Sequence, residues 1–196
     1  IAAEITQVAI EEKLEPKELI DNYLIKAMEE IGDRFEKQQA FVPELLMAGR
    51  AMKASLSLLQ PLLKGDEATS QLGTIVIGTV KGDLHDIGKN LVGSMFEGCG
   101  FQVVDLGVDA DSDKFVTAVK EHGANLVGLS ALLTTTMPYM KTIIEGLKAA
   151  GLRDKVKVMV GGAPVSSSFA EEIGADGYSD SANSAVIKAK ELLGVA

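Results

Sequence analysis

The amino-acid sequence predicts an α/β protein in which a bundle of helices precedes a five-stranded parallel sheet. Apolar residues recur every three or four positions through residues 15–64, which is typical of helices with one buried face. From residue 74 onwards, short β-branched runs alternate with amphipathic stretches. Residues 65–73 lie between these parts and are polar and rich in turn formers. We therefore expect a helical domain at residues 1–70 and an α/β domain at residues 73–196.

Three helices are expected in the first part. The stretch Glu4–Lys13 is amphipathic, and Pro16 follows it near the start of the next helix, where its missing N–H costs little. Two longer helices lie within residues 15–64. Their apolar positions are Leu19, Ile20, Tyr23, Leu24, Ala27, Met28, Ile31 and Phe35 in the first, and Leu45, Gly49, Met52, Leu56, Leu59 and Leu63 in the second. Such helices pack as a small bundle.

Five strands and five helices alternate in the second part. The strands are expected near Thr74–Val80, Gln102–Leu106, Asn125–Leu129, Lys157–Val160 and Gly177–Tyr178. The helices are expected near residues 87–99, 112–122, 137–150, 166–173 and 182–193. Strands joined by helices pair in parallel, and right-handed crossovers cover both faces of the sheet. The pattern predicts a flavodoxin-like (Rossmann-type) sheet with strand order 2-1-3-4-5.

Composition and charge exclude several classes of protein. Of the 196 residues, 46% are hydrophobic and 24% are charged, which is ordinary for a folded domain. The net charge of −9 comes from an acidic excess on both sides of residue 72, so neither nucleic acid nor an anionic membrane is an expected partner. No apolar run approaches the ~18 residues of a membrane span, and we expect no leader sequence.

The cysteine and histidine content is low. The single cysteine, Cys99, rules out an internal disulfide, so we expect a reducing, cytoplasmic setting. Cys99 and His122 each precede a glycine at a predicted helix end, and we expect both to be structural. Because the first residue is Ile1 rather than Met, we expect a processed or truncated chain.

Candidate chemistry lies at the carboxyl ends of the strands. Sheets with this strand order bind ligands there, between the first and third strands. Three unusual segments follow strand ends in the sequence: Lys81–Asn90, Ser130–Thr136 and Gly161–Pro164. We expect all three at the same rim of the sheet.

The first segment does not fit the common sites of this fold. Gly82–Asn90 is a poor phosphate loop, because five residues separate its glycines and Asn90 stands where Ser or Thr is needed. A phospho-receiver domain would need an aspartate where Ser130 stands. A zinc or iron site needs three or four protein ligands, whereas this loop offers one imidazole and two carboxylates. His85 better suits a metal that brings its own ligands, such as cobalt in a corrin ring, and Asp83 can hold the other ring nitrogen.

Three motifs carry a resemblance to a known family. Asp83-x-His85-x-x-Gly88, Ser130-x-Leu132 and Gly161-Gly162 resemble the signature of corrinoid-binding domains in methionine synthase and in the corrinoid proteins of methanogen and acetogen methyltransferase systems. The resemblance implies a cobalamin or related corrinoid that is bound base-off and His-on, with His85 as the cobalt ligand. It also implies a slot beside the sheet for the nucleotide tail of the cofactor.

The resemblance extends to further positions around the cofactor. Gly161 and Gly162 would let the tail pass close to the backbone, and Ser130 and Thr134 would offer hydroxyl groups to it. Thr136 stands six positions after Ser130, where the family has a serine that supports the aspartate of the ligand pair. The remaining cofactor-binding positions implied by the resemblance are Gly82, Leu84, Asp86, Gly88, Leu132 and Ala182.

The helical part is similar to the bundle that precedes the corrinoid domain in this family. Phe41-Val42-Pro43-Glu44 matches the family's Phe-Leu-Pro-Gln/Glu segment, and Phe35 precedes Val42 by seven residues. By this resemblance, Phe35 and Val42 cover the upper face of the corrin. Residues 1–70 would then be a helical cap, and the linker Gly65–Gly73 would let the cap move away from the cobalamin-binding domain.

The resemblance covers nearly the whole chain and implies a methyl carrier that is not catalytic alone. One substrate-specific methyltransferase would place a methyl group on Co(I), and a second would pass it to a thiol such as coenzyme M or to tetrahydrofolate. A reductive activator is the third implied partner. The length excludes methionine synthase itself, and the methyl donor stays open among methylamine, methanol, betaine and aryl ether. A cobalamin-binding sensor and a mutase subunit remain as alternatives.

Overall fold

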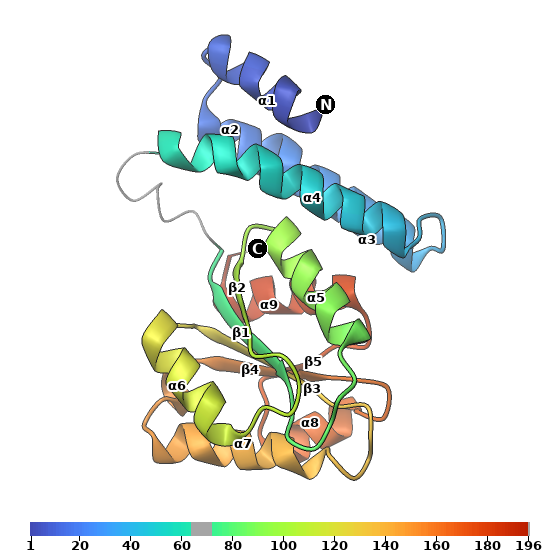
Figure 1. Ribbon diagram of the computed structural model, residues 1–196, viewed down its shortest axis with the longest axis vertical. Helices are drawn as coiled ribbons and strands as arrows, with labels where there is room; N and C mark the ends of the chain where they lie inside the picture. Colours follow the sequence, from blue (N-terminus) through green and yellow to red (C-terminus); the bar gives the residue numbers. More distant parts are fainter. Residues whose placement is uncertain (64–71, 196) are drawn as a thin grey trace. The chain divides into compact units, whose positions relative to one another are not determined.

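The computed structural model describes residues 1–63 and 72–195, which form two compact units. The first unit comprises the described residues up to 72 together with residues 94–101, and the second comprises residues 73–93 and those from 102 onwards. Figure 1 shows the order of their elements along the chain. Within the described residues, no helix combines the length and apolar character that a membrane crossing requires.

The helices of the first unit follow the predicted periodicity, with one interruption. The unit contains α1 (Ala2–Glu11), α2 (Pro16–Leu19), the π-helical segment η1 (Ile20–Leu24), α3 (Ile25–Glu36), α4 (Val42–Leu59) and the 3₁₀ turn η2 (Gln60–Leu62). Pro16 occupies the first turn of α2, as predicted. The wider π-helical turn shifts the helical register, and Tyr23 is exposed although a regular period aligns it with the apolar face.

The second unit is built on a parallel sheet of five strands. These are β1 (Thr74–Thr79), β2 (Gln102–Asp105), β3 (Leu126–Ser130), β4 (Lys157–Gly161) and β5 (Gly177–Tyr178), in the order β2-β1-β3-β4-β5. Every strand pair is parallel. The predicted fold class and strand order are confirmed, and each strand boundary lies within a residue or so of its predicted place.

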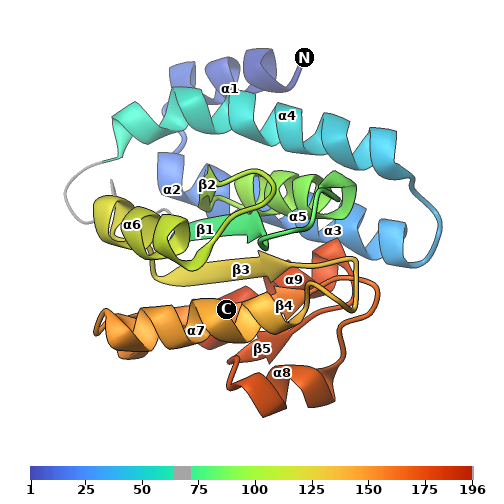
Figure 2. The ribbon, with the colours of Figure 1, turned by 60° about the horizontal axis from the view of Figure 1, so that its bottom comes forward.

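Five helices and one short turn connect and cover these strands. They are α5 (Ile87–Gly98), α6 (Ser112–His122), α7 (Pro138–Ala149), the 3₁₀ turn η4 (Arg153–Lys155), α8 (Ser167–Ile173) and α9 (Ala182–Leu193). Figures 1 and 2 show α6, α7 and α8 on one face of the sheet, with α9 and the start of α5 on the other. Side chains of Asp111, Ser166 and Ser181 cap the starts of α6, α8 and α9, and a left-handed glycine ends each of these helices.

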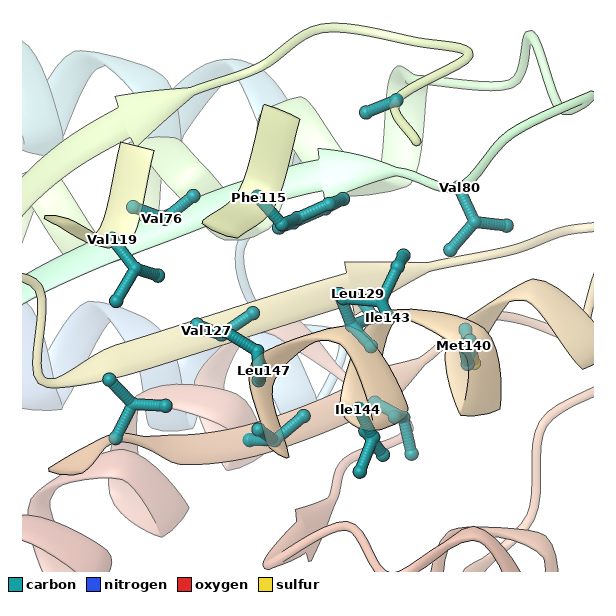
Figure 3. Close-up of a cluster of buried hydrophobic side chains, with 14 of the residues drawn as sticks. Val76, Val80, Phe115, Val119, Val127, Leu129, Met140, Ile143, Ile144 and Leu147 are labelled. Carbon is teal, nitrogen blue, oxygen red and sulfur yellow. The ribbon is translucent and has the colours of Figure 1, made fainter. Parts of the chain in front are cut away.

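The main core lies between the sheet and the helices α6 and α7. Figure 3 shows Val76 and Val127 of the strands facing Phe115, Ile143 and Leu147 of the helices. All five side chains are at most 1% exposed. This core fixes the strands rigidly, so the loops at their carboxyl ends start from defined positions. The predicted linker Gly65–Gly73 falls mostly on residues 64–71, which lie outside the described part.

Candidate functional site

Three predicted loops meet at the carboxyl edge of the sheet. In the strand register, Thr79 of β1 pairs with Ser130 of β3, and Ser130 pairs with Gly161 of β4. The loops that follow these residues therefore leave the sheet side by side. They contain the three segments that the sequence singles out, and the β1–α5 loop carries the histidine.

Asp83 is a fully buried carboxylate that ties two of these loops together. Its Oδ1 accepts hydrogen bonds from His85 Nδ1 at 2.7 Å and from the His85 backbone N–H at 3.1 Å. Its Oδ2 accepts from the backbone N–H groups of Leu132 at 2.8 Å and Leu133 at 3.2 Å, and from Thr136 Oγ1 at 2.8 Å. Both contacts implied by the resemblance, to His85 and to Thr136, are thus present.

The charge of Asp83 is stabilised by these donors. Burial by itself raises the pKa of Asp83, but the hydrogen bonds from His85, Leu132 and Thr136 outweigh it and hold the pKa far below its ordinary value. An ionised Asp83 only accepts, so His85 Nδ1 must carry the proton of this hydrogen bond. The lone pair of the neutral imidazole is then on Nε2, which is the arrangement of metal-ligating histidines that are oriented by a carboxylate.

The backbone around His85 is anchored from two sides. The buried Thr79 donates from its Oγ1 to the His85 carbonyl at 2.9 Å. From the β2–α6 loop, Asp109 accepts the Gly82 N–H on Oδ1 at 2.8 Å and donates its own N–H to the Asp83 carbonyl at 3.1 Å. Gly82 has a φ of +80°, a conformation that residues with a Cβ rarely adopt. The histidine therefore projects from a loop with little freedom at its N-terminal side.

A buried lysine fixes the other end of the loop. Lys89 Nζ donates to Asp105 Oδ1 at the end of β2 and to Asn90 Oδ1, each at 2.7 Å. Asn90 Nδ2 in turn donates to Asp86 Oδ2 at 3.1 Å, next to His85. The Lys89 side chain is 1% exposed, whereas that of Asp105 is 43% exposed. This network joins the first turn of α5 to β2.

Apolar side chains surround the histidine on the surface. Leu84 on its own loop and Ile87 at the start of α5 are 72% and 87% exposed. Leu132 and Leu133, whose N–H groups bind Asp83, are also exposed. The imidazole itself is half-exposed. Exposed apolar side chains gathered around a polar group mark a binding surface rather than a core. Their arrangement suits a broad apolar ligand that takes one nitrogen ligand from the protein.

The glycine pair after β4 leaves no room for side chains. Gly162 has a φ of +131°, and a Cβ placed on it would lie 1.9 Å from the Ala131 carbonyl oxygen. A Cβ on Gly161 would lie 3.1 Å from the carbonyl oxygen of Ser179, which precedes α9. The backbones of the β3–α7 loop, the β4–α8 loop and the start of α9 are thus closely packed. Ala182, in the first turn of α9, is buried beside them.

The other predicted residues differ in their exposure. Ser130 is partly buried at the end of β3, while Thr134 is exposed in the loop that follows. In the first unit, Phe35 near the end of α3 is partly buried, and Val42 at the start of α4 is 41% exposed. Neither of these two is a fully buried core residue of the bundle.

A small pocket lies at the start of α6. It has a volume of about 250 Å³ and is lined by Lys81, Ala110, Asp111, Ser112, Asp113, Tyr139, Thr142 and Ile143. Charges of both signs border it, and no histidine does.

The described ranges contain no cluster of three or more His, Cys, Asp or Glu side chains that could hold a metal ion. A single histidine fits a metal whose other ligands come from a macrocycle, so the residues around His85 suit a corrinoid.

Several supporting residues were not singled out from the sequence. Thr79 and Asp105 fall within predicted strands, Lys89 falls within the segment that fits a phosphate loop poorly, and Asp109 belongs to no predicted element or motif. Their contacts join segments that are 6 to 27 positions apart in the chain. A lysine in the first turn of a helix gives no sequence signal of burial, because lysine is normally exposed.

Comparison with known proteins identifies similar chains. Models of the B12 binding domain match residues 73–187 and residues 1–60. A dimethylamine corrinoid protein from Methanosarcina barkeri is 48% identical over 96% of this chain and 90% of its own length. A cobalamin-binding protein from Desulfitobacterium hafniense has a crystal structure that is 36% identical, with a TM-score of 0.80 over 96% of this chain and 89% of its own. The methanol:cobalamin methyltransferase complex from Methanosarcina barkeri includes a chain that is 29% identical, with a TM-score of 0.81 over 97% of this chain and 72% of its own.

Proposed function

This chain belongs to the family of proteins with B12-binding domains, and we propose that it is a corrinoid protein that carries methyl groups between two methyltransferases. One observation carries the proposal above the others. His85 presents Nε2 among exposed apolar side chains while the buried Asp83 holds its Nδ1 at 2.7 Å. A bound corrinoid would supply a cobalt centre that accepts and releases a methyl group.

The residues of the site divide the task of holding the corrinoid. His85 Nε2 is the axial ligand, and Asp83 with Thr136 fixes the tautomer and orientation of its ring. Leu84, Ile87 and Leu132 provide the apolar surface beneath the corrin ring. A cofactor bound base-off would extend its nucleotide tail away from the ring, and the glycine pair Gly161-Gly162 would lie beside that tail.

The helical unit acts as the cap of this site. In the proposal, Phe35 and Val42 shield the upper face of the corrin from water and oxygen between transfers. Their partial exposure supports this role, because side chains that only filled the bundle core would be buried. The cap then moves aside when a partner enzyme docks.

The names of the relatives support one choice of methyl donor. Corrinoid proteins named for dimethylamine and trimethylamine are 48% and 47% identical to this chain, so we favour a methylated amine as the methyl donor. The first partner is then an amine-specific methyltransferase. A second methyltransferase passes the methyl group to a thiol or to a reduced pterin, and a reductive activator restores the cofactor after oxidation.

The axial histidine is tested by substitution with a matched control. The chain has two histidines, and His122 is exposed at the end of α6. Protein loaded with cobalamin is reduced to the Co(II) state, and its paramagnetic resonance spectrum is recorded. Wild type and His122→Ala should show splitting from one nitrogen ligand. His85→Ala should lose this splitting and change its visible spectrum while it retains corrinoid. Identical spectra for all three proteins at full occupancy would refute the assignment of His85.

A further inference from the structure

One buried polar group of the second unit lacks a partner. The side chain of Asn183 is 5% exposed, and its Nδ2 is buried without a hydrogen bond among the described residues. Such a donor destabilises a folded chain, because it has lost its water and gained nothing in return. A ligand that accepts a hydrogen bond at this position would remove that cost. The amide is therefore either an unexplained defect or part of a binding site.

The helix start around Asn183 needs no help from this side chain. Ser181 caps α9 by accepting from the Ser184 N–H at 3.2 Å, and Ser184 Oγ accepts from the Ser181 N–H at 3.2 Å. This reciprocal pair satisfies two of the backbone donors at the helix start. Ser181 thus fills the capping position, and Nδ2 of Asn183 is available for another partner.

The chain that leads into α9, on whose first turn Asn183 lies, packs against Gly161. Ser179, four positions earlier, donates its N–H to the Val160 carbonyl at 3.3 Å, and its own carbonyl oxygen faces Gly161. The first turn of α9 therefore starts beside the carboxyl end of β4. Figure 1 shows α9 on the same face of the sheet as the start of α5, the helix that follows the His85 loop. Asn183 and the histidine loop are thus on one face and at one edge of the sheet.

We propose that Asn183 donates a hydrogen bond from Nδ2 to an acceptor on the nucleotide tail of the corrinoid and thereby selects corrinoids that carry this tail. The inference rests on the proposed function. A base-off tail offers two kinds of acceptor, a ring nitrogen of the lower base that no longer binds cobalt and the oxygens of the ribose phosphate. One N–H donor in a site that excludes water can satisfy either acceptor.

The test compares two corrinoids and one conservative variant. Cobalamin has the nucleotide tail, and cobinamide lacks it. Asn183→Leu keeps the branched shape of the side chain and removes both polar atoms. Equilibrium binding to the apo-protein should weaken about tenfold for cobalamin, the effect of one lost hydrogen bond, while cobinamide binding stays unchanged. The melting temperature of the apo variant should equal or exceed that of wild type, because the unpaired donor is gone.

The outcomes separate this inference from the function on which it rests. If cobalamin and cobinamide lose affinity equally, or neither does, the role of Asn183 is refuted although the protein still binds corrinoids. If wild type binds neither corrinoid, the proposed function fails first. A large drop in apo stability for both Asn183→Leu and Asn183→Ala would also refute the inference, because Asn183 would then have a structural partner.

A third corrinoid assigns the acceptor. A cobamide with a phenolic lower ligand keeps the ribose phosphate and has no ring nitrogen. A loss confined to cobalamin supports contact with the base, and an equal loss for the phenolic cobamide supports contact with the ribose phosphate. Unchanged binding of both tailed corrinoids would overturn the proposal.

Discussion

Asp83 accepts five hydrogen bonds on one buried carboxylate, and these donors favour its ionised form. The unfolded chain has no such donors, so its Asp83 takes up a proton near the ordinary pKa of 3.8. The folded protein takes it up only at much lower pH. The bonds at Asp83 therefore stabilise the fold fully above about pH 5, and this contribution is lost as the pH falls towards the lowered pKa.

We expect Asp83→Asn to remove this pH dependence from the apo-protein. At neutral pH the variant should be less stable by roughly 1–3 kcal/mol, because the amide turns an N–H group towards other donors. The difference in unfolding free energy from wild type should shrink between about pH 5 and about pH 2, because only wild type has this carboxylate to protonate. Urea unfolding at several pH values measures it. Stability curves that run parallel over this range would contradict the interpretation.

The same residue shows how far sequence reasoning reaches. Asp83, His85 and Thr136 were predicted together because the first two are two positions apart and the resemblance supplies the third. The N–H groups of Leu132 and Leu133 could not be predicted as donors, because backbone direction in a loop depends on how that loop packs. Asn183 gave no signal either, since a lone asparagine at the start of a helix is usually a capping residue.

Among the elements, the link between α5 and β2 depends on an asymmetric ion pair. The Lys89 ammonium is buried, but the Asp105 carboxylate is partly solvated. Removing the lysine leaves a carboxylate that water can reach. Removing the aspartate leaves a buried ammonium with only the Asn90 amide oxygen as its partner.

Asp105→Ala should therefore destabilise the protein more than Lys89→Met does. We expect a loss of roughly 2–4 kcal/mol for the former and about 1 kcal/mol for the latter, measured by denaturant unfolding of the apo-protein. Asp105→Asn is the matched control and should lie between them, since it keeps an acceptor oxygen and removes the charge. If Lys89→Met proved the more harmful change, the ion pair would not govern this junction.

The cap elements give a second prediction at this scale. Phe35→Ala combined with Val42→Ala should accelerate photolysis or aerobic oxidation of bound methylcobalamin, because the proposed shield is removed. The cost in apo stability should stay below about 2–4 kcal/mol, the cost of truncating core side chains. Ile5→Ala with Val8→Ala is the control, since these exposed apolar residues lie on α1 of the same unit. If the Phe35/Val42 variant had the photolysis rate of wild type but a much lower apo stability, Phe35 and Val42 would be core residues.

At the level of elements, most of the fold could be predicted. The strands and helices of the second unit were found from their apolar periods, and α6, α8 and α9 also have a capping side chain and a terminal glycine. The π-helical segment Ile20–Leu24 was missed, since a wider turn depends on packing and leaves no composition signal. The helix predicted at residues 15 onwards is accordingly one π-helical and two α-helical segments.

On the scale of the whole molecule, the proposed function requires the protein to open its cofactor face to two different enzymes. Residues 65–73 were predicted to connect the cap to the corrinoid domain as a flexible linker, and 65–71 of them lie outside the described part. A flexible chain of nine residues spans roughly 15–18 Å, and one of five residues spans roughly 11–13 Å. As a flexible linker, this segment would limit by its length how far the cap can move.

Deleting four residues from this segment should slow methyl transfer to both partners without reducing corrinoid content. The wild-type segment and a Gly/Ser segment of equal length are the controls, and both should transfer methyl groups at the same rate, because length rather than side chains sets the reach. Stopped-flow absorbance of the methylated and demethylated cofactor measures the rate with each partner. Photolysis of the bound methyl cofactor should stay slow in the shortened protein, since the cap would still cover the ring. Normal transfer rates after the deletion would show that the partners reach the cofactor without moving the cap, and the corrinoid assignment would be unaffected.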